Sequence, residues 1–89
     1  MAVNRNEILK NLCYTELVYA RINKKLNTDY SKHQIEDLVG KILIETDKKY
    51  FSKLGKNYYV VNFENNIKLT INSNTFRIIT ASRLNICKN

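Results

Sequence analysis

Residues Asn66–Thr80, with the sequence N-I-K-L-T-I-N-S-N-T-F-R-I-I-T, decide the fold of this chain. Ile67, Leu69 and Ile71 alternate with polar residues, and the alternation resumes after a polar pair, Ser73-Asn74. A period of two is typical of a strand that buries one face and exposes the other. The stretch therefore predicts two antiparallel strands joined by a tight turn.

A third strand is predicted before this pair, over Tyr58–Phe63, with Asn65-Asn66 as a two-residue turn. The last strand is expected over Thr75–Ala81. Pairing outward from the two turns sets Val60 opposite Ile71, and Leu69 opposite Ile78. One face of this meander is then apolar and must be covered by other elements, because it carries Val60, Ile67, Leu69, Ile71, Phe76 and Ile78.

The opposite face of the predicted meander mixes aromatic, apolar and cationic side chains. It would suit a sheet that stacks bases and holds phosphates, or an interface with a protein or a second copy. It could also be covered by residues 47–56, or by the C-terminal tail through Leu84 and Ile86. Its expected rows are Tyr59 with Asn72 and Thr75, Val61 with Thr70 and Arg77, and Phe63 with Lys68 and Ile79.

The first half of the chain has helical periodicity. Residues 7–26 fit one helix nearly as well as two, although a break near Cys13–Thr15 is favoured. Ser31 and Gln34 have the spacing of a capping box, and apolar residues then recur at helical spacing as far as Ile42. A helix is therefore predicted from Ser31 to about Glu45–Asp47.

These patterns predict an α+β fold, with two to three N-terminal helices packed on one face of a C-terminal three-stranded antiparallel β-meander. A chain of 89 residues has enough apolar surface for one core, so a single domain is expected over residues 1–89. Its expected parts are a helical part at about 5–46, a basic connector at 47–56, the meander at 57–81 and a short tail at 82–89.

Lys and Arg outnumber Asp and Glu by 15 to 8, which gives a formal net charge of +7. Such an excess attracts nucleic acid, although an AT-rich genome would also enrich Lys together with Asn and Ile. Arg21, Lys24 and Lys25 are explained equally well as favourable charges at the end of a helix. The predicted nucleic-acid or partner contacts are Lys48, Lys49, Lys53, Lys56, Tyr59, Phe63, Lys68, Arg77 and Ile79.

The residues that carry enzymatic or metal chemistry are sparse. Asp37 lies one helical turn after His33, the single histidine, and could orient it as a general base, but no nucleophile accompanies the pair. Two cysteines, Cys13 and Cys87, and one histidine are too few to hold a structural zinc. We predict a non-enzymatic protein with no catalytic residue, metal or small-molecule cofactor.

No apolar run approaches the length of a membrane span, and the N-terminus lacks the apolar stretch of a secretory signal. A cytoplasmic protein with no membrane partner is therefore expected.

Two phrases of the sequence resemble those of a known family. They are C-Y-T-E-L-V-Y-A-R-I-N-K-K-L at Cys13–Leu26 and I-K-L-T-I-N-S-N-T-F-R-I-I-T-A-S-R-L at Ile67–Leu84. The family consists of small proteins from low-GC Gram-positive bacteria and is known only as a domain of unknown function. The resemblance implies a bacterial host and a single-domain build, and it implies no catalytic residues.

Two fold-level analogies lead to further hypotheses. Three helices before a hairpin is the element order of a winged helix, although Glu36, Asp37 and Glu45 would face the phosphates from its recognition helix. Small mRNA-cleaving toxins also combine helices with a sheet, but they begin with a strand. The leading hypothesis is a bacterial or phage-borne regulator that contacts nucleic acid. The alternatives are a protein-binding adaptor or inhibitor from a mobile element, as a monomer or homodimer, and a small mRNA-cleaving toxin.

Overall fold

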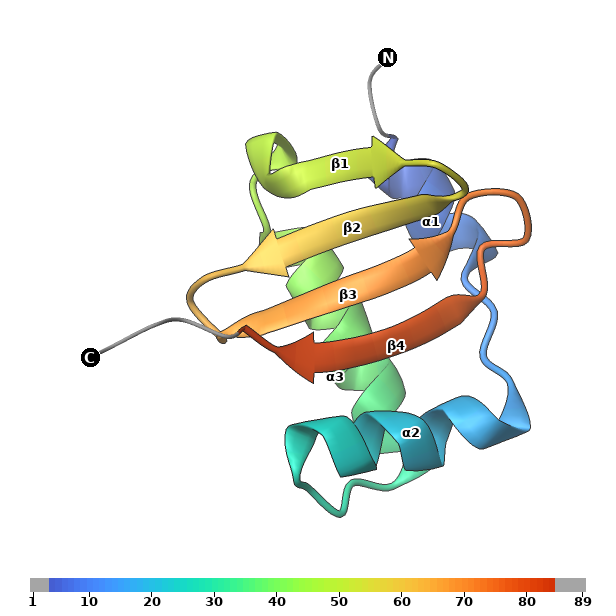
Figure 1. Ribbon diagram of the computed structural model, residues 1–89, viewed down its shortest axis with the longest axis vertical. Coiled ribbons are helices and arrows are strands. Elements are labelled where there is room, and N and C mark those ends of the chain that lie inside the picture. The colour runs from blue at the N-terminus through green and yellow to red at the C-terminus, as the bar shows by residue number, and fades with distance from the viewer. Residues whose placement is uncertain (1–3, 85–89) are drawn as a thin grey trace.

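The computed structural model describes residues 4–84 and shows an α+β fold, which confirms the predicted class (Figure 1). Three helices come first, followed by a short 3-10 turn and a four-stranded antiparallel sheet in the order β1-β2-β3-β4. The elements are α1 (Arg5–Asn11), α2 (Glu16–Leu26), α3 (Lys32–Glu45), η1 (Lys48–Tyr50), β1 (Phe51–Leu54), β2 (Asn57–Asn62), β3 (Ile67–Asn72) and β4 (Ile78–Arg83).

Helices α1 and α3 lie on one face of the sheet, and α2 lies beside the edge strand β4 (Figure 1). The core fills the space between these helices and the sheet. Burying each large aliphatic side chain there stabilises the fold by about 1.5–3 kcal/mol relative to exposure. The sheet contributes Phe51, Val60, Ile67, Leu69, Ile71, Ile78 and Ala81, and the helices contribute Ile8, Val18, Ile22, Leu26, Ile35, Val39, Ile42 and Leu43.

Both predicted helix boundaries in the first half are confirmed. Helix α1 ends at Asn11, and α2 begins after Thr15, whose backbone is extended although its side chain makes no capping hydrogen bond. The Ser31 side chain accepts from the Gln34 amide at 3.1 Å, while the Ser31 amide donates to the Gln34 side chain at 2.8 Å. This reciprocal capping box fixes the start of α3.

Arg5 closes the opposite end of α3, a role that the sequence did not reveal. Its Nη1 atom donates to the carbonyl oxygens of Leu43 at 3.3 Å, Ile44 at 2.7 Å and Thr46 at 3.1 Å. Its guanidinium also lies 5.8 Å from the centre of the Phe51 ring. One cation therefore satisfies carbonyls at the negative end of α3 and links α1 to β1.

The predicted three-stranded meander is wrong by one strand. The expected connector at 47–56 contains η1 and β1, and β1 pairs with β2 so that Phe51 lies opposite Val60 and Leu54 opposite Asn57. Gly55 is the first residue of the two-residue turn and has φ of 63°, a conformation that favours glycine. The connector extends the sheet instead of covering its outer face.

The first predicted turn, Asn65-Asn66, is also wrong. The loop between β2 and β3 contains four residues, Phe63–Asn66, because Asn62 pairs with Ile67. The Asn62 side chain accepts from the Asn65 amide at 2.7 Å, which stabilises this wider turn. Val60 consequently lies opposite Leu69 rather than Ile71. The shift is two residues, so each side chain stays on its predicted face.

The loop before β4 differs more from the prediction. The Asn72 side chain accepts hydrogen bonds from the amides of Asn74 and Thr75, which lengthens the turn. Phe76 lies outside any strand and has a left-handed backbone with φ of 58°. A bulge in β4 then pairs Ile71 with Ile78 but Thr70 with Thr80, leaving Ile79 without a partner on β3. The predicted outer rows that contained Thr75, Arg77 and Ile79 therefore do not form.

The C-terminal part of the predicted tail lies outside the described residues, including Ile86 and Cys87. Strand β4 continues to Arg83, beyond the predicted end of the meander at Ala81. Among residues 4–84, no helix is both long enough and apolar enough to cross a membrane.

Candidate nucleic-acid interface

The face of the sheet turned away from α1 and α3 has no described helix over it (Figure 1). We call this surface the open face. One of its rows crosses all four strands, from Ser52 through Tyr59 and Thr70 to Thr80. None of the eight acidic residues of the chain lies on a strand. The open face comprises Ser52, Leu54, Asn57, Tyr59, Val61, Lys68, Thr70, Asn72, Thr80 and Ser82.

Two predicted contact residues, Tyr59 and Lys68, meet near the centre of the open face. The Lys68 ammonium lies 5.6 Å from the centre of the Tyr59 ring, within the range of a cation–π contact. The Asn57 amide lies 3.4 Å from the Tyr59 hydroxyl oxygen and donates to it. Both predicted residues are half-buried, so the ring and the ammonium have defined positions and still reach solvent.

A groove runs between α2 and β4, next to the open face. Its volume is about 690 Å³, and we call it the cationic groove. Arg21, Lys24 and Lys25 are all exposed along its α2 side. The Thr80 hydroxyl oxygen is buried at the β4 side and has no hydrogen-bond partner among residues 4–84. The groove is lined by Ala20, Arg21, Lys24, Lys25, Ile79 and Thr80.

A smaller hollow continues the cationic groove toward the N-terminal end of α2. Arg77 and Ile79, both predicted contacts, lie here beside Arg21. Leu17 lies in the same hollow and is 75 % exposed, so an apolar side chain accompanies the cations.

The core and the ends of α2 fix this helix against β4. Val18, Ile22 and Leu26 are buried. Before the helix, Cys13 donates its amide to the Phe76 carbonyl at 2.8 Å and accepts from the Ile78 amide at 2.9 Å. At the other end, Arg83 donates to the Leu26 carbonyl oxygen at 3.2 Å. The cations of α2 therefore have a fixed position relative to the strands.

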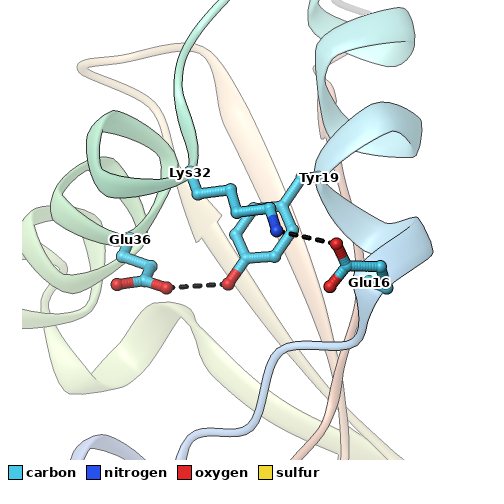
Figure 2. Close-up of polar contacts among 4 residues, drawn as sticks. All are labelled: Glu16, Tyr19, Lys32 and Glu36. Atoms are coloured by element: carbon cyan, nitrogen blue, oxygen red, sulfur yellow. Dashed lines mark hydrogen bonds and ion pairs between the residues drawn. The ribbon is translucent and has the colours of Figure 1, made fainter.

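A set of polar contacts between α2 and α3 supports the same placement (Figure 2). The Tyr19 hydroxyl donates to the Glu36 carboxylate at 2.7 Å, and the Lys32 ammonium lies 2.7 Å from the Glu16 carboxylate. Lys32 also lies 5.4 Å from the centre of the Tyr19 ring. Such exposed pairs contribute little, about 0–1 kcal/mol each, so apolar burial holds α2 and these contacts orient it.

Burial of Tyr19 and its hydrogen bond to Glu36 should make the fold less stable at alkaline pH. Burial, followed by the hydrogen bond to Glu36, raises the pKa of Tyr19 to about 12 from 10.0. The folded state thus retains a proton that the unfolded chain releases near pH 10, and stability should decrease as the pH rises from 10 to 12. Urea unfolding at pH 8, 10 and 11.5 tests this expectation. Tyr19→Phe should show a smaller decrease, and an equal decrease would contradict it.

The other predicted contacts lie elsewhere. Four lysines lie on or next to β1, at the opposite edge of the sheet from the cationic groove. We call them the β1-edge lysines; they are Lys48, Lys49, Lys53 and Lys56. Three strand spacings, about 14 Å, separate the two edges. Phe63 lies in the loop after β2, where its ring meets Tyr50 edge-on at 5.1 Å. The predicted row of Phe63 with Lys68 and Ile79 therefore does not form.

The sequence explains Arg21, Lys24 and Lys25 equally well as charges at a helix end, so they are absent from the predicted contacts. Their spacing of three and four residues sets them on one side of α2, and this signal was available. The position of α2 beside β4 could not be foreseen, because it depends on packing between segments far apart in the chain.

The histidine considered as a general base lies on the outside of α3. His33 Nε2 is 3.4 Å from an Asp37 carboxylate oxygen, and both side chains are largely exposed. No group of His, Cys, Asp and Glu side chains within residues 4–84 is arranged to hold a metal ion.

A family model described as "Protein of unknown function (DUF3781)" matches residues 6–82, so the chain belongs to this family. The match confirms the resemblance inferred from Cys13–Leu26 and Ile67–Leu84, and the host range of the family stays a prediction. No curated protein and no solved structure matches the chain.

Proposed function

We propose that this member of the DUF3781 family is a non-enzymatic protein that binds nucleic acid through the open face and the cationic groove. The observation that carries the proposal is the position of three exposed cations of α2 beside strands that carry no acidic residue. A bacterial or phage-borne regulator acting in the cytoplasm would fit this role.

The two parts of the surface divide the task of binding. Cations position a nucleic acid by contacting phosphates, while polar and aromatic side chains contact the bases. Arg21, Lys24 and Lys25 supply the first kind of contact, with Lys68 as a fourth cation on the open face. Tyr59 supplies the second kind, together with the accessible polar side chains of Ser52, Asn57 and Ser82 on the open face.

The distribution of charge supports this surface over the recognition helix of a winged-helix protein. Helix α3 carries Glu36, Asp37 and Glu45, and its carboxylates would repel phosphates. Apart from tyrosines, every ionisable side chain on the strands is a lysine or an arginine. A polyanion would therefore approach the sheet and α2 in preference to α3.

The apolar residues on which the protein-binding alternative was based do not form one continuous surface. That surface combined Tyr59, Phe63 and Ile79. Phe63 lies instead in the loop after β2, in edge contact with Tyr50 and 57 % exposed, and Ile79 lies at the edge beside α2. The residues that remain on the open face are predominantly polar, which favours a polar ligand over a large apolar protein interface.

Salt dependence of binding tests the proposal. Four phosphate contacts should weaken binding by about 50-fold for a single strand and about 150-fold for a duplex when salt rises from about 50 to 200 mM. The measurement is fluorescence anisotropy of labelled 12-nucleotide single strands and duplexes of RNA and DNA. The chain should bind at least one of them at low salt, and the absence of binding to all of them would contradict the proposal.

A further inference from the structure

Given the proposed function, which this inference refines, the geometry points to a single-stranded polynucleotide as the ligand, with one base stacked on Tyr59 and the backbone running along the cationic groove. Single-stranded RNA and DNA share the chemistry that this requires, namely unpaired bases and a phosphate chain.

The breadth of the surface disfavours a duplex. The major groove of B-DNA is about 12 Å wide and admits one helix or a two-stranded ribbon. Here four strands lie side by side, with α2 against β4 (Figure 1). Because the cations of α2 border the strands, α2 cannot enter a groove without the sheet meeting the duplex backbone. A single strand can lie across the surface without such a collision.

Tyr59 has the position that a stacking residue needs. It lies on β2 at an inner position of the open face, half-buried, with Thr70 beside it on β3. In the structure, the Lys68 ammonium lies over the face of the Tyr59 ring, 5.6 Å from its centre. Stacking of a base on an aromatic ring is stronger than an exposed cation–π contact, so a base can displace this ammonium. The displaced ammonium then lies close to the phosphate of the stacked nucleotide.

Accessible polar side chains of the open face near Tyr59 offer hydrogen bonds to the edges of unpaired bases. Ser52 is exposed next to Tyr59 in the row that continues through Thr70 to Thr80, and Ser82 is half-buried opposite Lys68. The hydroxyl groups of Thr70 and Thr80 are not among these contacts, because Thr70 is 7 % exposed and the Thr80 oxygen is buried. Bases expose these edges fully only when they are not paired, which is how single strands are recognised. The row leads directly to Arg21 and Lys24, which contact the phosphates.

A tryptophan reporter tests the stacking directly, because the chain has no tryptophan of its own. In Tyr59→Trp, adding a single-stranded 8-mer of RNA or DNA should quench the fluorescence, and adding the matching duplex should leave it unchanged. Phe63→Trp is the control, because Phe63 lies in the loop after β2, where its ring contacts Tyr50, and belongs to no row of the open face. It should show no quenching with either ligand.

Affinities distinguish failure of this inference from failure of the proposed function. Tyr59→Ala should weaken single-strand binding about tenfold, and Tyr59→Phe should keep most of the affinity. Circular dichroism checks that both variants are folded. Duplex binding as tight as single-strand binding, or fluorescence of the Tyr59→Trp variant that no single strand quenches, would overturn the inference and leave the proposed function standing. No binding of any polynucleotide at low salt would overturn both.

Discussion

The variant R21Q/K24Q/K25Q is expected to bind nucleic acid about 100-fold more weakly than the unaltered chain at about 100 mM salt. Each phosphate contact releases counterions, so losing three contacts should also lower the slope of log affinity against log salt by about 2 for a single strand. Glutamine keeps the helical propensity of these positions. Anisotropy titrations at four salt concentrations measure the affinity and the slope together.

The β1-edge lysines provide the matched control. K48Q/K49Q/K53Q removes the same number of positive charges from the opposite edge of the sheet. If the ligand lies along the cationic groove, this variant should lose less than about tenfold, because it changes only the long-range field. Equal losses in the two variants would show that net charge alone drives binding. A larger loss in the control would move the site to β1.

The elements with local signals could be predicted from the sequence, and the elements that depend on distant pairing could not. The start of α3 depends on two side chains three residues apart, Ser31 and Gln34, so its prediction needed no tertiary information. Strand β1 buries only Phe51 among its four residues, and its exposed lysine gave it the composition of a loop. Its identity as a strand comes from its pairing with β2.

The division of the sheet into two faces was predictable, while the rows across it were not. Both tight turns were assumed to contain two residues, and asparagine side chains widened each of them. A shift of two residues preserves the alternation, so Val60, Leu69, Ile71 and Ile78 are buried as predicted. The bulge that moves Ile79 into the cationic groove leaves no comparable signal in the sequence.

The cationic groove could not be predicted from the sequence either, because it forms between segments that are far apart in the chain. Tyr59 and Lys68 were predicted correctly as members of the outer face, since alternation along each strand determines this. The three cations of α2 become part of the surface only because α2 packs against β4. Arg5 is a second case, because its partners lie at the far end of α3 and nothing near Arg5 in the sequence identifies them.

Arg5→Ala is expected to lower the free energy of unfolding by about 2 kcal/mol, the range for hydrogen bonds that involve a charged donor. The guanidinium contacts three carbonyl oxygens at the end of α3, with the shortest distance, 2.7 Å, to Ile44. Its loss leaves these carbonyls without their donor and removes a cation from the negative end of the helix dipole. Urea unfolding followed by circular dichroism measures the change, and the melting temperature should fall by about 10 °C.

Two further variants separate the geometry of Arg5 from its charge. Arg5→Lys keeps the cation but not the planar fork of donors, so it should recover less than half of the loss. Lys10→Ala removes an exposed cation from the same helix and should change stability by no more than about 0.5 kcal/mol. Full recovery by lysine would assign the effect to the helix dipole alone. A loss below about 0.5 kcal/mol in Arg5→Ala would mean that the three carbonyl contacts do not stabilise the fold, because water replaces them at no cost.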